Sequence, residues 1–382
     1  MIDKGKISAF QLAVMMIPTV VATAILVLPS VAAKYAGRDL WCSPILACVT
    51  GLFIVYVSYK LFQFYPGQNL IQYSERIISR IPGKLLGLIL IFSYFINDGI
   101  IVREYGEFIM GAFLNKTPMQ VVTFSMVFIS ALAVRSGIEV LARCALIFVP
   151  IAMIILFFIF LLLIPDFDPH NMFPMFEYGL KPSLLGAVPT LTWYSEYIDL
   201  VILIPFVARQ DRGKIMKWSS ISVLIVMMSM VITNIVALFL LGKLTADESY
   251  PVMMGARYVS LADFLEHLEA LAMAFWVLGM FIKISVVYYV LVIMIADWLK
   301  LADYRPLVFT VGFLIALNSK WVAPNAEQLN AMLSSSLVFF YITLQLIVPS
   351  VLYLVACIRN RRAKPQEPGE QRTPRARAPE QG

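Results

Sequence analysis

The sequence predicts an all-α polytopic membrane protein with about ten transmembrane helices, arranged as two inverted halves of five. Of the 382 residues, 60% are hydrophobic and only 14% are charged, and the mean hydropathy is +0.82. Water-soluble domains do not reach these values. Apolar runs long enough to cross a bilayer recur along the chain. The first run of each half is interrupted, which is typical of carriers built from inverted repeats.

The first predicted span, residues 7–35, is interrupted between two prolines. Pro18 and Pro29 flank a small centre, Val21-Ala22-Thr23-Ala24, and a proline inside a helix removes a backbone hydrogen bond. The run could imitate a signal peptide, but its length and the spans that follow argue against cleavage. In the turn that comes next, Asp39 is expected to cap the second span.

The other spans are apolar runs separated by polar or basic loops. Their predicted bounds are residues 40–64, 85–114, 118–134, 138–164, 183–207, 218–241, 264–295, 306–317 and 333–358. The ninth is short enough to be a re-entrant segment. Two repeats, 7–164 and 183–358, would form one membrane domain, 1–358. The Pro-, Arg- and Glu-rich tail, 359–382, is expected to be disordered.

The sixth span departs most from the composition of the chain. A carboxylate at the bilayer centre costs roughly 2.5–3.5 kcal/mol on insertion scales, and broken backbone at that depth is tolerated only where protein or water satisfies it. With the interrupted first span, this break predicts a binding site. The polar centre consists of Thr190, Thr192, Trp193, Tyr194, Ser195, Glu196, Tyr197 and Asp199.

The distribution of positive charge predicts the orientation of the spans. With the amino terminus inside, 21 lysines and arginines fall on the inner side and 7 on the outer side, while Arg103 and Lys283 fall within the membrane. Because positive residues accumulate on the cytoplasmic side, both termini are expected to be cytoplasmic. The net charge of +6 therefore reflects orientation and contact with membrane lipid, and we expect no nucleic-acid partner.

Sequence motifs for metal binding and catalysis are absent. The four cysteines lack C-x-x-C spacing, and His170 and His267 form no cluster with cysteine and carboxylate that resembles a metal site. There is no paired-histidine motif and no G-x-S-x-G elbow, which disfavours an intramembrane enzyme. We expect no metal, no cofactor and no catalytic residue.

The two interrupted spans together predict a ligand site. A half-helix that begins after the first break presents free N–H groups, which suit a carboxylate; a half-helix that ends near Thr192 presents free C=O groups, which suit an ammonium. A zwitterion such as an amino acid is therefore the expected ligand. The expected ligand-binding residues are Ala22, Thr23, Ala24, Tyr94, Asn97, Asp98, Thr192, Trp193, Tyr194, Glu196, Ser285 and Tyr289.

One lysine, Lys283, lies within the eighth predicted span and requires an explanation. A lone ammonium inside a membrane helix either loses its proton or pairs with an acid. Glu196, Asp98 and Glu104 are the candidate partners, and the sequence does not choose between them. We expect Lys283 and Glu104 to belong to one charge network.

Four stretches in fixed order carry a resemblance: the Ala-Gly-Arg-Asp39 turn, the Trp-Tyr-Ser-Glu196 break, Tyr250-Pro251 with Arg257, and the Trp276 to Tyr289 stretch around Lys283. They resemble the endospore germination permease family, the B subunits of spore germinant receptors in the amino acid/polyamine/organocation superfamily. The resemblance covers about residues 6–358. It implies a LeuT fold of ten helices, a spore inner-membrane location, a small-molecule germinant, and as partners a membrane A subunit and a C-subunit lipoprotein.

Two functions remain open at this point. The first is a germinant-sensing subunit; the second is a proton-coupled amino-acid transporter, because in this superfamily a membrane lysine can stand in for a sodium ion. One departure concerns ligand identity: the superfamily's usual glycine-rich break in the first helix is here Val-Ala-Thr-Ala24, without glycine.

Overall fold

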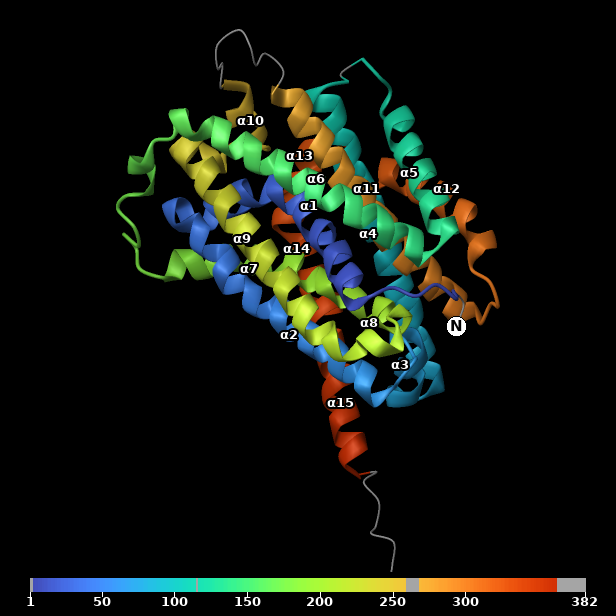
Figure 1. The fold of residues 1–382 in the computed structure, drawn as a ribbon. Helices are drawn as coiled ribbons and strands as arrows, with labels where there is room; N and C mark the ends of the chain where they lie inside the picture. Colours follow the sequence, from blue (N-terminus) through green and yellow to red (C-terminus); the bar gives the residue numbers. More distant parts are fainter. Residues whose placement is uncertain (1–2, 115, 259–267, 363–382) are drawn as a thin grey trace, which may run out of the picture.

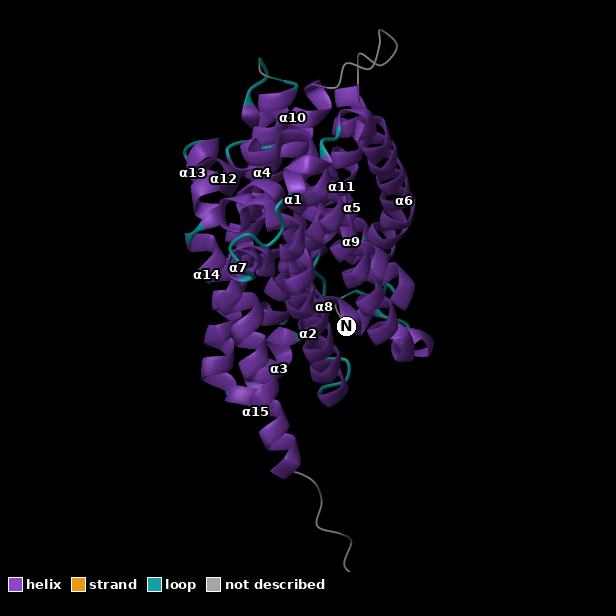
Figure 2. Cartoon of the chain, turned by 90° about the vertical axis from the view of Figure 1, so that its left-hand side faces the viewer, coloured by secondary structure: helices purple, strands orange, loops and turns teal. Residues whose placement is uncertain are grey.

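The computed structural model describes residues 3–114, 116–258 and 268–362, and its regular elements are helices (Figures 1 and 2). One isolated parallel bridge, between Ile7 and Val207, accompanies them. The long helices are α1 (Ala9–Ala36), α2 (Ser43–Phe64), α4 (Arg80–Ala112), α5 (Met119–Ser136), α6 (Ile138–Leu163), α7 (Lys181–Ser195), α9 (Ile215–Leu241), α11 (Leu268–Leu299), α12 (Arg305–Trp321) and α15 (Val348–Arg362).

Short helices and single turns connect the long ones. The short α-helices are α3 (Leu70–Ile78), α8 (Leu200–Leu203), α10 (Pro251–Tyr258), α13 (Ala326–Ser334) and α14 (Ser336–Tyr341). The 3₁₀ turns are η1 (Gly37–Cys42), η2 (Ile164–Asp166), η3 (Pro169–Met172), η4 (Glu196–Asp199), η5 (Ile204–Phe206), η6 (Arg209–Lys214) and η7 (Gly242–Ala246), and η8 (Ile342–Ile347) is a π turn.

Seven helical segments of the described residues are long and apolar enough to cross a membrane. The first, Ala9–Phe64, contains both α1 and α2, so the seven segments account for eight predicted spans. The ninth predicted span is α12, which passes the same test as a bent pair with α13. The sixth is divided into α7, η4 and α8. The chain is a multi-pass membrane protein, and helices lie where the ten spans are predicted.

The contacts between helices follow the two-half arrangement. The first and seventh spans, α1 and α9, pack together, and so do the sixth and second, α7 and α2. The fourth and eighth, α5 and α11, pack together, as do the ninth and third, α12 and α4. When each span is replaced by its equivalent in the other half, the pair of first and seventh becomes the pair of sixth and second, and the pair of fourth and eighth becomes the pair of ninth and third. A protein made of two repeats requires this pattern.

The predicted break in the first span is wrong for this conformation. α1 runs as one α-helix from Ala9 to Ala36, with Pro18 and Pro29 inside it. Its start is set by a capping box, because Ser8 Oγ accepts from Gln11 N and Gln11 Oε1 accepts from Ser8 N. All of the residues from Leu12 to Ala33 are buried. Packing on every side therefore holds α1 helical across both prolines.

The predicted break in the sixth span is confirmed. The α-helix α7 ends at Ser195, and the chain tightens into the 3₁₀ turn η4 before the single turn α8 and the 3₁₀ turn η5. Polar residues therefore interrupt this span without unwinding it into a loop.

Three smaller sequence predictions need correction. Asp39 does not cap α2; its carboxylate accepts from Phe176 N at 3.0 and 3.1 Å and anchors the loop after α6. The basic loop after the second span contains an amphipathic helix, α3. The tail begins later than predicted, because α15 continues to Arg362. Residues 259–267, where the eighth span was predicted to begin, and 363–382 of the tail lie outside the described residues.

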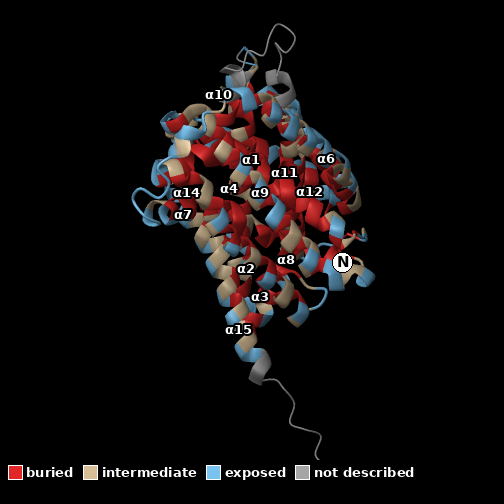
Figure 3. Cartoon of the chain, turned by 60° about the vertical axis from the view of Figure 1, so that its left-hand side comes forward, coloured by how far each residue is buried: buried red, intermediate tan, exposed pale blue. Residues whose placement is uncertain are grey.

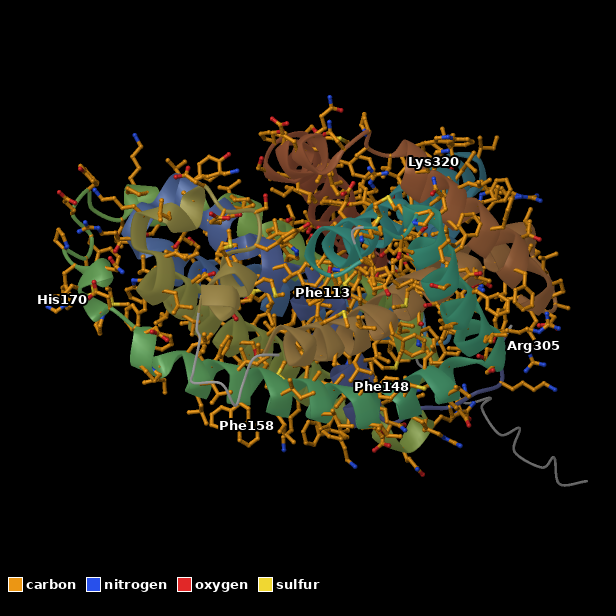
Figure 4. All side chains as sticks on the ribbon, turned by 90° about the horizontal axis from the view of Figure 1, so that it is seen from above. Phe113, Phe148, Phe158, His170, Arg305 and Lys320 are labelled. Atoms are coloured by element: carbon orange, nitrogen blue, oxygen red, sulfur yellow. The ribbon has the colours of Figure 1, made fainter. Side chains whose placement is uncertain are left out.

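Buried residues fill the middle of the bundle, and exposed residues lie around it (Figure 3). Many exposed side chains are apolar, among them Phe128, Phe157 and Phe158, each more than half exposed. Figure 4 shows Phe158 at the outer edge of α6, and His170 in the loop beyond it at the rim of the bundle. A broad apolar surface of this kind is suited to lipid.

The amino-terminal segment closes one end of the bundle. Ile7 N donates to Phe206 O and Ala208 N donates to Ile7 O, at 3.1 and 3.0 Å. Asp3 Oδ2 accepts from Ile138 N and from the Tyr289 hydroxyl. This closure lies in the half of the bundle that carries α3, α8 and the end of α15, which we call the α15 end; the opposite end carries α10 (Figure 1).

Candidate functional site

A buried ion pair joins three helices at the middle of the bundle. Lys283 lies midway along α11, and its Nζ is 2.9 Å from both carboxylate oxygens of Glu196. The same nitrogen donates to Thr23 Oγ1 of α1 at 2.8 Å. The Lys283 side chain is 0% exposed and that of Glu196 is 14% exposed. The structure thus selects Glu196 among the three predicted partners of Lys283.

The break in the sixth span places Glu196 at this point. α7 ends at Ser195, so Glu196 is the first residue of the 3₁₀ turn η4. The Ser195 hydroxyl lies 2.7 Å from both Thr192 O and Gln345 Oε1. Gln345 belongs to the π turn η8, and such turns are frequent at functional sites. Gln345 is not among the predicted site residues, because a π turn has no signal in the pattern of apolar residues.

A small cavity lies beside the ion pair. Its volume of about 20 Å³ holds roughly one water molecule. The Tyr341 hydroxyl donates to Asn97 Oδ1 at 2.7 Å on its wall. An amino acid does not fit, so the site is closed in this conformation. The lining residues are Thr23, Asn97, Ile100, Ile101, Glu104, Thr192, Trp193, Glu196, Lys283, Leu333 and Tyr341.

Glu104 carries an unpaired carboxylate at this cavity. It lines the cavity beside Lys283 and also a second one, of about 10 Å³, toward Tyr250 and Trp276. No hydrogen bond or ion pair to its side chain occurs within the described residues. Lys283 and Glu104, which are predicted to belong to one charge network, therefore line the same cavity but do not pair directly.

Two tryptophans fix α1 next to the ion pair. Trp193 Nε1 donates to Thr23 Oγ1 at 3.2 Å, and Trp276 Nε1 donates to Ala22 O at 2.6 Å. Trp276 also packs against Phe108, with ring centroids 4.1 Å apart, and Phe108 packs against Tyr250 at 5.3 Å. Tyr250 directly precedes α10. This aromatic cluster, Phe108, Tyr250 and Trp276, therefore covers the site on the side of the α10 end.

Of the twelve predicted ligand-binding residues, the structure brings five to the wall of the cavity: Thr23, Asn97, Thr192, Trp193 and Glu196. The others have different surroundings. The Tyr94 hydroxyl donates to Asp199 Oδ1, and Asp98 is buried without a hydrogen-bond partner. The Ala22 carbonyl accepts from Trp276, and Ala24 is fully buried.

The remaining three predicted residues face other helices. Tyr194 packs on α2, where a Cβ on Gly51 would come within 2.9 Å of its Cδ1. Ser285 is buried and its hydroxyl has no partner. The Tyr289 hydroxyl donates to Asp3 at the α15 end. Polar side chains on a helix point in several directions, and their order along the chain does not show which of them meet.

Recognition by free backbone groups, predicted at the first break, has no support in the closed conformation. Since α1 is helical across residues 21–24, its N–H groups there bond within the helix. The polar groups at the cavity are side chains: the Glu104 carboxylate and the Asn97 amide nitrogen, and the Lys283 ammonium, which is bonded to Glu196 and Thr23 in this conformation. They combine negative and positive charge within one small cavity, an arrangement suited to a small zwitterion.

Comparison with known proteins places this chain in a family. The family profile described as "Spore germination protein" matches residues 6–326. Spore germination protein KB of Bacillus subtilis (strain 168) is 28% identical over 366 residues, which cover 94% of this chain and 97% of that protein.

Solved structures agree on the fold. The structure of Mhp1, a nucleobase-cation-symport-1 family transporter in a closed conformation with bromovinylhydantoin bound, matches with a TM-score of 0.65 and 13% identity, over 94% of this chain and 80% of that chain. MhsT in complex with L-phenylalanine matches with a TM-score of 0.60 and 14% identity, over 92% and 97%. Both have the LeuT-type fold. This chain therefore belongs to the spore germination protein family and has that family's expected LeuT-type fold.

Proposed function

We propose that this protein is the germinant-sensing subunit of a spore germination receptor and that it binds a small amino-acid-like ligand beside Lys283. The observation that carries the proposal is the ion pair itself. Lys283, Glu196 and Thr23 come from α11, η4 and α1, so a ligand that competes for any of the three changes how these helices are held together. A sensor requires such a link between binding and conformation.

The charges at the cavity support an amino-acid-like ligand. The ammonium of an amino acid would meet the unpaired Glu104 carboxylate, and its carboxylate would meet the Asn97 amide and the Lys283 ammonium, since all three line the cavity. Trp193 and Ile101 supply apolar walls for a side chain. Because the cavity holds only about one water molecule, binding requires the site to open.

The aromatic cluster is the proposed gate. Positive residues of the Arg359-Asn-Arg-Arg362 stretch stand at the α15 end, which supports a cytoplasmic location for that end and for both termini. The α10 end, with the aromatic cluster, then faces outward, where a germinant arrives. The family supports a location in the spore inner membrane and assembly with a membrane A subunit and a C-subunit lipoprotein.

A proton-coupled amino-acid transporter is the second candidate, favoured by the LeuT-type fold and by a buried lysine, Lys283, midway along the long apolar helix α11. A transporter has to open the α15 end as well, and the amino-terminal segment closes that end through Asp3 and Ile7. This closure favours the sensor, because a sensor needs to open only one end of the bundle to bind its ligand.

The germinant dose response of spores that carry Glu196→Gln tests the site. Glutamine keeps the shape of Glu196 but removes the charge that holds Lys283, so we expect a shifted or lost response. Glu248→Gln, in the segment before α10, is the matched control and is expected to respond as the natural protein does. Equal and negligible effects of both changes would argue against a site at Glu196.

Uptake of labelled amino acids into proteoliposomes, with and without a pH gradient, separates the two functions. A sensor binds without net uptake. Uptake driven by the gradient would assign the chain to the transporters.

A further inference from the structure

A second polar cluster lies near the ion pair and joins α4 to η4. Tyr94 and Asp98 are one turn apart on α4 and therefore share a face. The Tyr94 hydroxyl donates to Asp199 Oδ1 of η4, three residues after Glu196. All three side chains are buried, with Tyr94 at 5%, Asp98 at 0% and Asp199 at 3% exposure.

Acidic groups outnumber basic ones in this region of the described residues. The carboxyl groups of Glu196, Glu104, Asp199 and Asp98 lie in electrostatic reach of one another or of Lys283. Arg103, which is also buried, is occupied by Glu107 at 2.6 Å. Lys283 can balance one of the four carboxylates and is committed to Glu196. The other three need another source of neutralisation.

The three remaining carboxyl groups, those of Glu104, Asp199 and Asp98, have different surroundings. Glu104 lines two water-sized cavities, so water can solvate it. Asp199 accepts from Tyr94. Asp98 has neither: both of its oxygens are buried without a hydrogen-bond partner, and it does not line the cavity beside Lys283. An ionised carboxylate in such a place is strongly unfavourable, because nothing replaces its lost hydration.

We propose that Asp98 is a proton-binding site of this protein and is held as a neutral carboxylic acid in the closed conformation. Asp199, the other acid of this cluster, offers Asp98 no compensating positive charge. The tyrosines within electrostatic reach of Asp98 add no positive charge: Tyr288 from α11, Tyr341 from α14 and Tyr94 from α4 itself. A proton neutralises Asp98 without any further ligand.

A metal ion is the less suitable occupant. Sites for hard cations use several oxygen ligands around one centre, and no group of three or more His, Cys, Asp or Glu side chains in the described part of the chain is arranged to hold a metal ion. The Tyr94 hydroxyl is directed at Asp199 and not at Asp98.

The 3₁₀ turn η4 links the proton on Asp98 to the ion pair of Lys283 and Glu196. Glu196 and Asp199 are the first and last residues of η4, so a ligand that displaces Glu196 also moves Asp199 and admits water to Asp98. The O–H bond of Asp98 then breaks, its electron pair stays on the carboxylate, and the proton passes to water. This coupling rests on the proposed ligand site, whereas the protonation of Asp98 in the closed state does not.

Infrared spectroscopy of the purified, ligand-free protein tests the protonation directly. At neutral pH an aspartate in water is almost fully ionised, so a carbonyl band of a protonated carboxylic acid identifies a buried acid. We expect this band in the natural protein, its loss in Asp98→Asn, and its persistence in Glu107→Gln, the control that removes an acid paired with Arg103. Asp98→Leu is the second variant, because a dry site without partners also tolerates an apolar side chain.

The outcomes separate the alternatives. Absence of the band from the natural protein at neutral pH, or its persistence in both Asp98 variants, would overturn the proposal. Loss of the band when sodium chloride replaces choline chloride would also overturn it, because Asp98 would then bind the metal ion. A band that depends on Asp98 and is the same in both salts supports it. Since no germinant is present, this result is independent of the proposed ligand site.

Discussion

Lys283→Met is the substitution with the most direct consequence for stability. Removing one member of a buried ion pair costs about 3–5 kcal/mol, because the other charge stays buried and unpaired. Glu196 keeps 14% of its side chain exposed and faces a water-sized cavity, which places the cost near the lower limit. The lost hydrogen bond to Thr23 adds about 1 kcal/mol. We therefore expect a loss of about 3–4 kcal/mol in the unfolding free energy, measured by denaturant titration in detergent.

The double variant Lys283→Met/Glu196→Gln supplies the critical comparison. It removes both charges, so we expect it to regain about 2 kcal/mol or more relative to the sum of the two single changes. Lys214→Met is the control: Lys214 pairs with Asp211 at 3.0 Å but is 63% exposed, and the cost is expected below about 1 kcal/mol. Additive losses in the double variant would refute the ion pair as the link between α11 and η4.

Three further outcomes are expected. Lys283→Arg keeps a charge that hardly deprotonates, so germinant response and assembly are expected to survive better than in Lys283→Met; equal loss of coupled amino-acid uptake in both, at normal expression, would favour the transporter. Gly186→Ala places a Cβ 2.7 Å from Ser43 Oγ. This overpacking is expected to lower the unfolding free energy by about 1–3 kcal/mol, seen as a lower thermal midpoint. Gly111→Ala, whose added Cβ lies in open space, is expected to leave the midpoint unchanged. Deleting residues 365–382, which are almost without apolar side chains, is expected to leave membrane insertion intact, as a fractionation assay would show.

The fold is largely predictable because a bilayer restricts it. Backbone groups in hydrocarbon must bond within their own segment, so each long apolar run has to become a helix, and the loops fall at the charged stretches. α5 and α6 begin within one residue of the predicted starts at residues 118 and 138. The amphipathic helix α3 was missed because its charges make it resemble a loop, although its apolar face is buried, as Tyr73 and Ile77 illustrate.

Predictions about interruptions succeeded where polar side chains mark them and failed where prolines alone do. In the sixth span the carboxylates of Glu196 and Asp199 require polar partners. Both residues lie in the 3₁₀ turn η4, where the α-helix is interrupted. In the first span Pro18 removes one N–H, but tight packing of its neighbours keeps α1 helical. Tertiary packing therefore outweighed the local effect of proline.

The candidate site was predictable in its chemistry but not in its geometry. The intramembrane charges Lys283 and Glu196 stand out in the sequence because each alone is unfavourable in a membrane. Which acid pairs with Lys283 depends on helix rotation, and Asn97 and Asp98 show the difficulty: they are adjacent, yet only Asn97 lines the cavity. Gln345 and Tyr341 approach the site through the π turn and its neighbouring helix, and no sequence pattern indicates this.

The two ends of the bundle are closed by different means, and this difference bears on the function. Toward α10, closure depends on side chains, chiefly Trp276, whose indole donates to the Ala22 carbonyl next to Thr23. At the α15 end, closure depends on main-chain pairing of Ile7 with Phe206 and Ala208, reinforced by Asp3. A ligand that displaces Lys283 from Thr23 disturbs the first closure directly, because Ala22 and Thr23 are adjacent. The second closure involves no residue that lines the cavity, so it can stay shut while the ligand is bound, as a sensor requires and a transporter does not.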